Sequence, residues 1–407
     1  MLNKVTSHRL FRNTSALVVM QLFTYVAPFV VLPYLSRVLG VDGFGLMVAA
    51  LSLTVIANVC TDYGFNLSAT YLISRKQGHT AYVSKVIAAI YTLKLFLLIL
   101  VFLGIALYLT FSVSYTPLAI AAIYITVFFQ AFMSPWLFQG IEKMKLITYS
   151  TIASRMVYVV MIFLLVKHSD DYDLALMCNA AATIIASVLA NFLIRKEGFF
   201  FARPSIRLVR FIFLYSSQFF LSRVFLQASS SISVLVLSFS VTPGQLGLYG
   251  ASDKLLAAFK SLVGPLSQAL YPYMANTGNT KLLIKLSVFI GLALFVPASI
   301  GYYFSEEILV VIFGPEFAGS STILRIFIIT GFFSFFSILY GYPAFAAIKR
   351  VGLANKSVIY GGVAQVVMLV MMSAFELVSI INVALTVLAS SSLILLIRIY
   401  WFRKYKI

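Results

Sequence analysis

The sequence consists largely of successive apolar runs, each about 20 residues long. A helix of that length measures about 30 Å, which matches the hydrocarbon thickness of a membrane. Of the 407 residues, 61% are hydrophobic and only 10% are charged. A soluble domain carries about 25% charged residues, so this chain has too few to cover a water-facing surface. The sequence therefore predicts a polytopic membrane protein.

Hydropathy windows of about 19 residues predict twelve membrane spans. Lipid offers the backbone no hydrogen-bond partner, so each span must be a helix or part of a closed barrel. These runs lack the strand-like alternation of apolar and polar residues, which favours an all-α fold. The predicted spans cover 14–36, 46–70, 83–107, 116–138, 146–166, 174–194, 211–239, 249–273, 282–304, 320–343, 357–375 and 377–398.

The longest predicted loop, about residues 195–210, is basic and joins the sixth and seventh spans. It divides the chain into two lobes of six helices, residues 1–200 and 201–407. Because six is an even number, the lobes have the same orientation and form a parallel repeat. A short internal similarity agrees with duplication, since Gly45-Leu46-Met47-Val48-Ala49 matches Gly247-Leu248-Tyr249-Gly250-Ala251.

The distribution of charge predicts the orientation. The chain has 30 Lys and Arg against 12 Asp and Glu, a net charge of +18. Lys and Arg collect in cytoplasmic loops, because positive segments resist translocation. With a cytoplasmic N-terminus, 22 of these cations fall in inner segments and only Arg37 and Lys167 fall in outer ones. We therefore expect both termini to be cytoplasmic, and we interpret the basic excess as a topological signal that argues against nucleic-acid binding.

Several charges fall inside the predicted spans, where each costs about 2.5–3.5 kcal/mol at the bilayer centre. The two acids, Asp62 and Asp253, cannot balance the cations, so the excess predicts a cavity that contains water or an anion. The six cations are Lys94, Arg155, Arg223, Lys254, Lys260 and Arg325.

Depth within the spans separates these cations. Arg155, Arg223 and Lys260 lie deep and are predicted substrate-binding residues. Lys94 is a fourth candidate, with extension toward the membrane surface as its alternative. Lys254 and Arg325 lie near outer ends, where such extension is favoured. Asp62 and Asp253 are predicted to couple ions or to act as structural partners of the cations.

Polar residues at helical spacing accompany three of these charges, as expected of helices that line a solvated cavity. Prolines interrupt several spans and favour bent helices. The polar stripes are Asn58, Asp62 and Asn66; Thr148, Thr151, Arg155 and Tyr158; and Ser216, Arg223, Gln227 and Ser230. The prolines are Pro28, Pro33, Pro135, Pro265, Pro272, Pro297 and Pro343.

Three local motifs resemble those of lipid-linked oligosaccharide flippases. Arg37-Val38-Leu39-Gly40 with Gly43-Phe44-Gly45 and Asp62-Tyr63-Gly64-Phe65-Asn66 is similar to the opening of these proteins. The motifs Pro135-Trp136-Leu137-Phe138-Gln139-Gly140 and Ile312-Phe313-Gly314-Pro315-Glu316-Phe317 are similar to later parts. The resemblance extends from about residue 10 to about residue 350. It is to O-antigen and polysaccharide-unit flippases, a branch of the superfamily that includes multidrug extrusion transporters.

The resemblance implies twelve helices in two lobes around a central cationic cavity. It also implies flipping of undecaprenyl-pyrophosphate-linked sugar repeat units from the cytoplasmic to the periplasmic leaflet of a bacterial inner membrane. Protons or sodium ions would drive the cycle, and O-antigen assembly proteins are a further partner that the resemblance leaves open. The choice of Arg155, Arg223 and Lys260 depends on their depth, because the family varies in where its cavity charges fall.

Two other functions are considered. An ion-coupled exporter of drugs or small metabolites would share the fold, but such exporters favour acidic cavities for cationic cargo. A membrane glycosyltransferase or polymerase would need a catalytic domain, for which the short loops leave little room. Asp171-Tyr172-Asp173 is formally a D-x-D motif, but it lies on an outer turn. No P-loop is present, so we expect no ATP hydrolysis by this chain. Cys60 and Cys178 lie in apolar runs, so we expect neither a disulfide nor a metal site. We also expect neither enzyme activity nor a cofactor.

Overall fold

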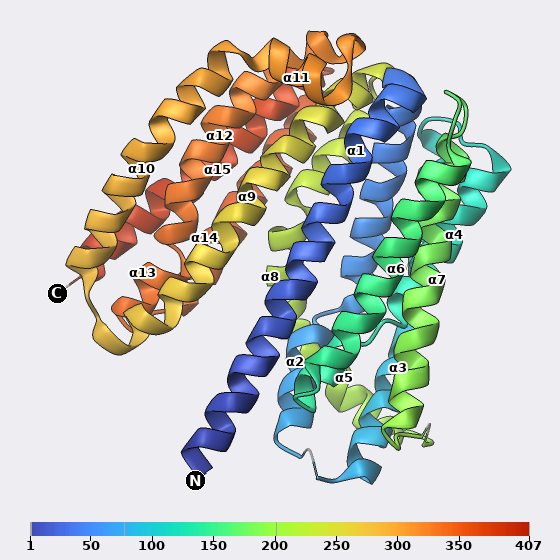
Figure 1. The fold of residues 1–407 in the computed structure, drawn as a ribbon, viewed down its shortest axis with the longest axis vertical. Helices are drawn as coiled ribbons and strands as arrows, with labels where there is room; N and C mark the ends of the chain where they lie inside the picture. The colour runs from blue at the N-terminus through green and yellow to red at the C-terminus, as the bar shows by residue number, and fades with distance from the viewer. Residues whose placement is uncertain (1, 77, 201, 407) are drawn as a thin grey trace. The chain divides into compact units, whose positions relative to one another are not determined.

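The computed structural model describes residues 2–76, 78–200 and 202–406 (Figure 1), except for the side chains of 2–29, 221–222 and 226–229. In these ranges every regular element is a helix, and nine helical segments are long and apolar enough to cross a membrane. The chain is therefore an all-α polytopic membrane protein, as its apolar runs predict. The number of twelve spans stays a prediction.

The helices form two compact units. Unit 1 comprises Met1–Leu39 and Ala50–Val224, and unit 2 comprises Gly40–Ala49 and Phe225–Ile407. The division falls within α1 and α8. The predicted lobes, 1–200 and 201–407, stay a prediction. Two elements cross the division, α1 (Leu2–Asp62), which is kinked by non-helical backbone at Gly40 (φ 64°), and α8 (Ile206–Leu237).

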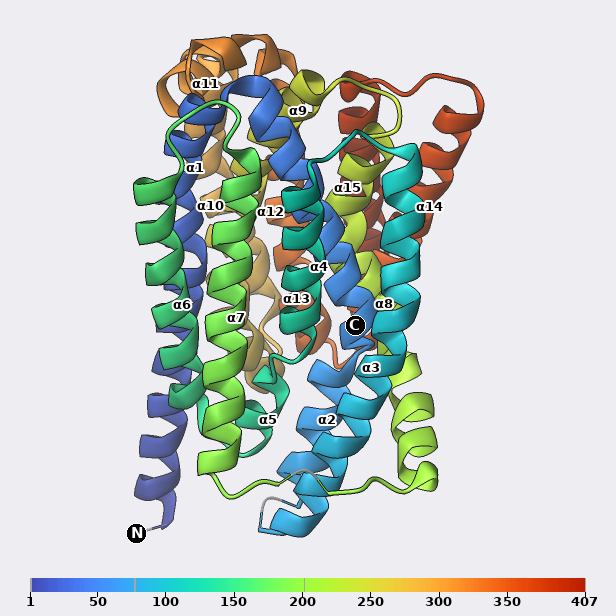
Figure 2. The same ribbon diagram turned by 90° about the vertical axis from the view of Figure 1, so that its right-hand side faces the viewer.

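In unit 1, α4 and α6 both pack along α7 (Figure 2), and α2 packs against the short helix α5. Beside its parts of α1 and α8, the unit contains α2 (Phe65–Ser74), α3 (Thr80–Phe111), α4 (Pro117–Ala131), α5 (Pro135–Gly140), α6 (Met144–Leu165) and α7 (Tyr172–Lys196).

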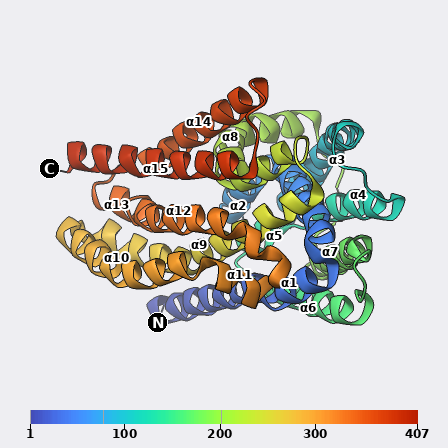
Figure 3. The ribbon, with the colours of Figure 1, turned by 90° about the horizontal axis from the view of Figure 1, so that it is seen from above.

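In unit 2, α12 packs against α9, α10 and α15, and the view from above shows it between α10 and α15 (Figure 3). The helix α11 lies at one end of this unit, and α13 lies at the other end with the C-terminus (Figure 1). The elements are α9 (Pro243–Thr277), α10 (Thr280–Tyr303), α11 (Ser305–Phe313), the 3₁₀ helix η1 (Pro315–Ser320), α12 (Ser321–Leu339), α13 (Tyr342–Ala347), α14 (Gly352–Ala374) and α15 (Ile380–Tyr405).

Three of the predicted spans are broken, which corrects their prediction as single helices. At each break either the backbone has left-handed φ angles or a proline follows shortly after. At the first, Tyr63 and Gly64 have left-handed φ angles of 44° and 82°, and a Cβ on Gly64 would lie 2.8 Å from Phe219 Cβ. The broken spans are 46–70 at residues 63–64, 116–138 at residues 132–134, and 320–343 at residues 340–341.

The breaks in the fourth and tenth predicted spans share one local structure. Each is followed by a six-residue helix, α5 or α13, and then by a non-glycine residue in the left-handed region, Glu142 (φ 58°) or Lys349 (φ 56°). The next amide donates back to a phenylalanine carbonyl, from Lys143 to Phe138 at 2.9 Å and from Arg350 to Phe345 at 2.8 Å. This is a recurring helix-ending motif.

The two copies of the internal similarity pack against each other within unit 2. A Cβ on Gly45 would lie 1.8 Å from the Pro243 carbonyl oxygen, and one on Gly247 would lie 2.1 Å from the Val41 carbonyl oxygen. Both positions therefore require glycine for this approach. Phe44 is fully buried, and its ring makes edge contacts with Phe317 and Phe313. We call these contacts of Gly40–Ala49 with the start of α9 the glycine clasp.

Candidate functional site

Unit 2 contains a cavity of about 390 Å³ with three charged side chains and six serines in its walls. We call it the polar cavity. Its charged residues are Asp253 and Lys260 of α9 and Arg398 of α15. The serines are Ser230, Ser267, Ser334, Ser337, Ser390 and Ser391, contributed by α8, α9, α12 and α15. Two of the sequence-predicted site residues, Asp253 and Lys260, are thus brought together in one cavity.

Lys260 is the central residue of the 35-residue helix α9. Seven residues, or about two helical turns, separate it from Asp253, so both lie on one helix face. The two charges interact electrostatically, but no hydrogen bond joins them. Asp253 is 5% exposed, and Ser230 donates to its two carboxylate oxygens at 2.9 and 3.0 Å. Among the residues that the structure describes, no hydrogen-bond partner of Lys260 is found, and its side chain lines the polar cavity.

Arg398 was not predicted as a cavity residue, because it was grouped with the cytoplasmic cations of the C-terminus. It is 7% exposed and ties together three helices. Its Nε donates to Ser357 Oγ at 2.8 Å, its Nη1 donates to the carbonyl and hydroxyl of Ser337, and its Nη2 donates to the Ala354 carbonyl. The spacing of Ser391, Ile394 and Arg398 on one helix face was the sequence signal for this placement.

A second group of charges lies in unit 1. Asp62, at the end of α1, is 8% exposed and interacts electrostatically with Lys94 and Arg223. Asn66 donates to its carboxylate. Lys94 is 2% exposed, and its Nζ donates to the Ala131 carbonyl. This buried position, with an acceptor and an acid beside it, is typical of a structural cation.

The contact of Lys94 belongs to a network around the break between α4 and α5. Tyr91 donates to Asn191 Oδ1 at 2.8 Å and lies 2.9 Å from Ser134 Oγ. Both Tyr91 and Asn191 also donate to the Phe132 carbonyl at 3.3 Å. A broken helix leaves carbonyls without partners, which is costly inside a membrane. This network provides those partners.

The remaining predicted residues lie elsewhere. Arg155 is half-buried on α6 and interacts electrostatically with Tyr158. The stripe on α8 is divided between the units, since Ser216 contacts Ser68 at 2.7 Å in unit 1 and Ser230 contacts Asp253 in unit 2. The side chain of Gln227 lies outside the described residues. Arg325 donates to Ser305 Oγ at 2.9 Å.

The two acids of the D-x-D motif make separate contacts, Asp171 from the turn before α7 and Asp173 from the first turn of α7. Asp171 accepts from the Lys167 and His168 amides, both at 2.8 Å, and these hydrogen bonds lower the pKa of its carboxyl group. Asp173 accepts from Thr116 at 3.1 Å. Within residues 2–76, 78–200 and 202–406, no group of three or more His, Cys, Asp or Glu side chains could hold a metal ion.

A comparison with known families identifies the chain. The family model described as polysaccharide biosynthesis protein matches residues 10–278. The chain belongs to this family. A Shigella dysenteriae relative named for O-antigen transport is 28% identical over 309 residues, which are 74% of this chain and 77% of the relative. An Escherichia coli (strain K12) relative of the same name is 29% identical over 276 residues, 65% of each chain.

Solved structures of membrane transporters have the same fold. An inward-facing multidrug resistance transporter of the MATE family aligns with a TM-score of 0.66 at 13% identity, over 96% of this chain and 97% of that one. The lipid II flippase MurJ in an inward closed conformation also gives 0.66, at 14% identity, over 95% of this chain and 87% of MurJ. At these identities the likeness shows the fold alone.

Proposed function

We propose that the chain flips undecaprenyl-pyrophosphate-linked O-antigen repeat units from the cytoplasmic to the periplasmic leaflet of a bacterial inner membrane. The driving step is ion-coupled alternating access. Membership of the polysaccharide biosynthesis family and the names of the two relatives support this cargo class. The relatives are named as transporters, which supports a role without catalysis.

The observation that carries the proposal is the polar cavity, with Lys260 at the middle of α9. A pyrophosphate with attached sugars cannot cross hydrocarbon without replacement of its hydration shell. The Lys260 ammonium and the serine hydroxyls would supply that replacement, because charge-assisted hydrogen bonds to phosphate are strong. Arg155 and Arg223 are further candidates for anion contacts. The buried contacts of Lys94 and Arg398 favour a structural part for both.

The orientation of the chain follows from its charge, because Lys and Arg collect on the cytoplasmic side of a membrane protein. In unit 2, Lys349 and Arg350 lie at the end with the C-terminus, where Arg350 packs on the Tyr405 ring at 4.4 Å. The acids Glu306, Glu307 and Glu316 lie on α11 and η1 at the opposite end (Figure 1). This separation of charge within unit 2 supports a cytoplasmic C-terminus.

Alternating access needs a closure that opens and reforms at the periplasmic end. The glycine clasp suits that closure, because the backbones of Gly45 and Gly247 meet without intervening side chains. Small residues allow such close backbone contact between membrane helices. We assign the ion-coupling step to Asp62 or Asp253, with a proton or sodium ion as the coupling species.

Reconstitution tests the proposal. Liposomes containing the protein and a fluorescent undecaprenyl-pyrophosphate-linked sugar should move the lipid between leaflets, and an imposed ion gradient should accelerate the movement. Equal movement in protein-free liposomes would contradict flipping. Rates that do not change when ionophores collapse the proton and sodium gradients would remove ion coupling. Movement of cationic dyes instead of the lipid would favour the drug exporter.

A further inference from the structure

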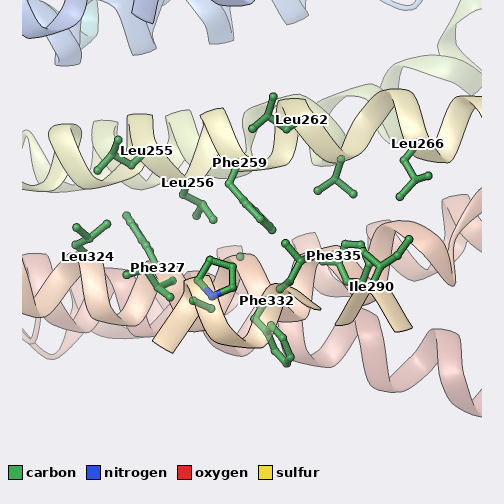
Figure 4. A pocket seen from close by; sticks show the side chains of 16 residues that line it. Leu255, Leu256, Phe259, Leu262, Leu266, Ile290, Leu324, Phe327, Phe332 and Phe335 are labelled. Carbon is green, nitrogen blue, oxygen red and sulfur yellow. The ribbon is translucent and has the colours of Figure 1, made fainter. Parts of the chain in front are cut away.

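A second cavity in unit 2 is open and entirely apolar. It has a volume of about 490 Å³ and is bounded by α9, α10 and α12 (Figure 4). None of the 16 residues that line it carries a polar side chain. Figure 4 shows Leu256 and Phe259 of α9 across from Phe327 of α12. We call this cavity the apolar groove.

The apolar groove and the polar cavity lie on two faces of one helix pair. Leu256 lines both. On α9, Phe259 lines the groove and its neighbour Lys260 lines the polar cavity. On α12, Phe335 lines the groove and its neighbour Ser334 lines the polar cavity. The seam between α9 and α12 therefore separates a hydrocarbon surface from a cationic one.

The seam matches a molecule with an anionic head joined to a hydrocarbon chain. The groove extends along α9 from Leu255 to Leu266, about 16 Å of helix, and Lys260 lies within that range. A membrane phospholipid keeps its headgroup at the surface, about 15 Å from the bilayer centre. Its head would not be near the level of Lys260 while its chain occupied the groove.

We propose that the apolar groove binds the polyprenyl chain of the cargo while the pyrophosphate occupies the polar cavity. This inference rests on the proposed function and adds a second binding site to it. The isoprene units next to the pyrophosphate would pack on Phe259, Leu262 and Phe332, which line the groove and are not buried in the core. The chain would thus cross the α9–α12 seam beside Leu256, which lines both cavities.

Binding measurements with two ligands test the groove. Undecaprenyl pyrophosphate has the full chain, and dimethylallyl pyrophosphate has one isoprene unit on the same head. Ala298→Trp fills the groove from α10, and Ala293→Trp is its matched control, because Ala293 is exposed on the same helix outside the groove. With protein in nanodiscs, Ala298→Trp should lower the affinity for undecaprenyl pyrophosphate by about tenfold or more. The affinity of this variant for dimethylallyl pyrophosphate should not change, and the control should bind both ligands with the affinity of the natural protein.

An unchanged affinity of Ala298→Trp for undecaprenyl pyrophosphate would overturn the inference. An equal loss of affinity for both ligands would also overturn it. Lys260→Met separates this result from the proposed function. It should weaken both ligands, and if it weakens neither, the assignment of the head to the polar cavity fails independently of the groove.

Photo-crosslinking identifies the occupant without any substitution. A polyprenyl pyrophosphate with a diazirine on its chain should label α9, α10 and α12, and excess undecaprenyl pyrophosphate should compete. Equal labelling of the groove by a diazirine phosphatidylglycerol would identify bulk lipid as the occupant and overturn the inference.

Discussion

At the breaks in the fourth and tenth predicted spans, a cation donates to a backbone carbonyl, but the surroundings of the two breaks differ. In unit 1, Lys94 donates to the Ala131 carbonyl just before the break, and Lys94 is 2% exposed. In unit 2, Arg398 donates to the Ser337 carbonyl just before the break, but Arg398 and Gly341 also line the polar cavity. The first break is enclosed by protein, whereas the second forms a wall of the candidate site.

The difference shows that a charge inside a predicted span has at least two uses. Lys94 and Arg398 satisfy carbonyls that a broken helix leaves without partners. Lys260 has no hydrogen-bond partner among the described residues and lines a cavity. Depth in the membrane alone therefore does not separate Lys260 from Lys94 and Arg398, whereas the hydrogen bonds of Lys94 and Arg398 to carbonyls do.

Arg398→Met should have the largest effect on stability. It removes four hydrogen bonds, including those to the Ser337 and Ala354 carbonyls, in a buried position. We expect a loss of about 3 kcal/mol in the free energy of unfolding. Reversible unfolding in mixed detergent micelles measures it. A loss below about 1 kcal/mol would contradict the comparison of Arg398 with Lys94, because Arg398 would then not stabilise the broken tenth span.

Lys94→Met should cost less, about 2 kcal/mol, because one hydrogen bond and one of the two electrostatic partners of Asp62 are lost. The same unfolding assay measures this change. Lys85→Met, on the exposed part of α3, is the matched control and should change stability by less than about 0.5 kcal/mol. Equal stability of the Lys94 and Lys85 variants would contradict the structural part assigned to Lys94.

Asp171→Asn should have the smallest effect and sharpens the comparison, since Asp171 also satisfies two backbone groups but lies on an exposed turn. We expect a loss below about 1 kcal/mol. Because hydrogen bonds lower the pKa of this carboxyl group, its stabilisation is present above the usual aspartate pKa and is lost as pH falls through the lowered value. The variant and the natural protein should therefore become equally stable in acid. A difference that persists there would contradict this origin.

The sequence predicted the helical fold because hydropathy depends on composition over a window, and each predicted span overlaps a helix. Pro135 and Pro343 predicted bending near two of the breaks, although not the short helices α5 and α13 that follow. The break at Tyr63 and Gly64 was not predicted, because tyrosine is ordinary in a helix and a single glycine is tolerated there. Of the candidate site, Lys260 and Asp253 were predicted from depth. Arg398 was missed because charge near a C-terminus looks cytoplasmic, although its side chain bonds to α12 and α14.

The central claim is that Lys260 binds the anionic head of the cargo, whereas Lys94 stabilises the break between α4 and α5. The most direct test is the flipping rate per folded protein molecule, measured in liposomes for Lys260→Met and Lys94→Met. The account predicts at least about a tenfold loss for Lys260→Met, as expected for one lost charge-assisted contact, and a rate close to that of the natural protein for Lys94→Met. A natural rate for Lys260→Met would contradict the account.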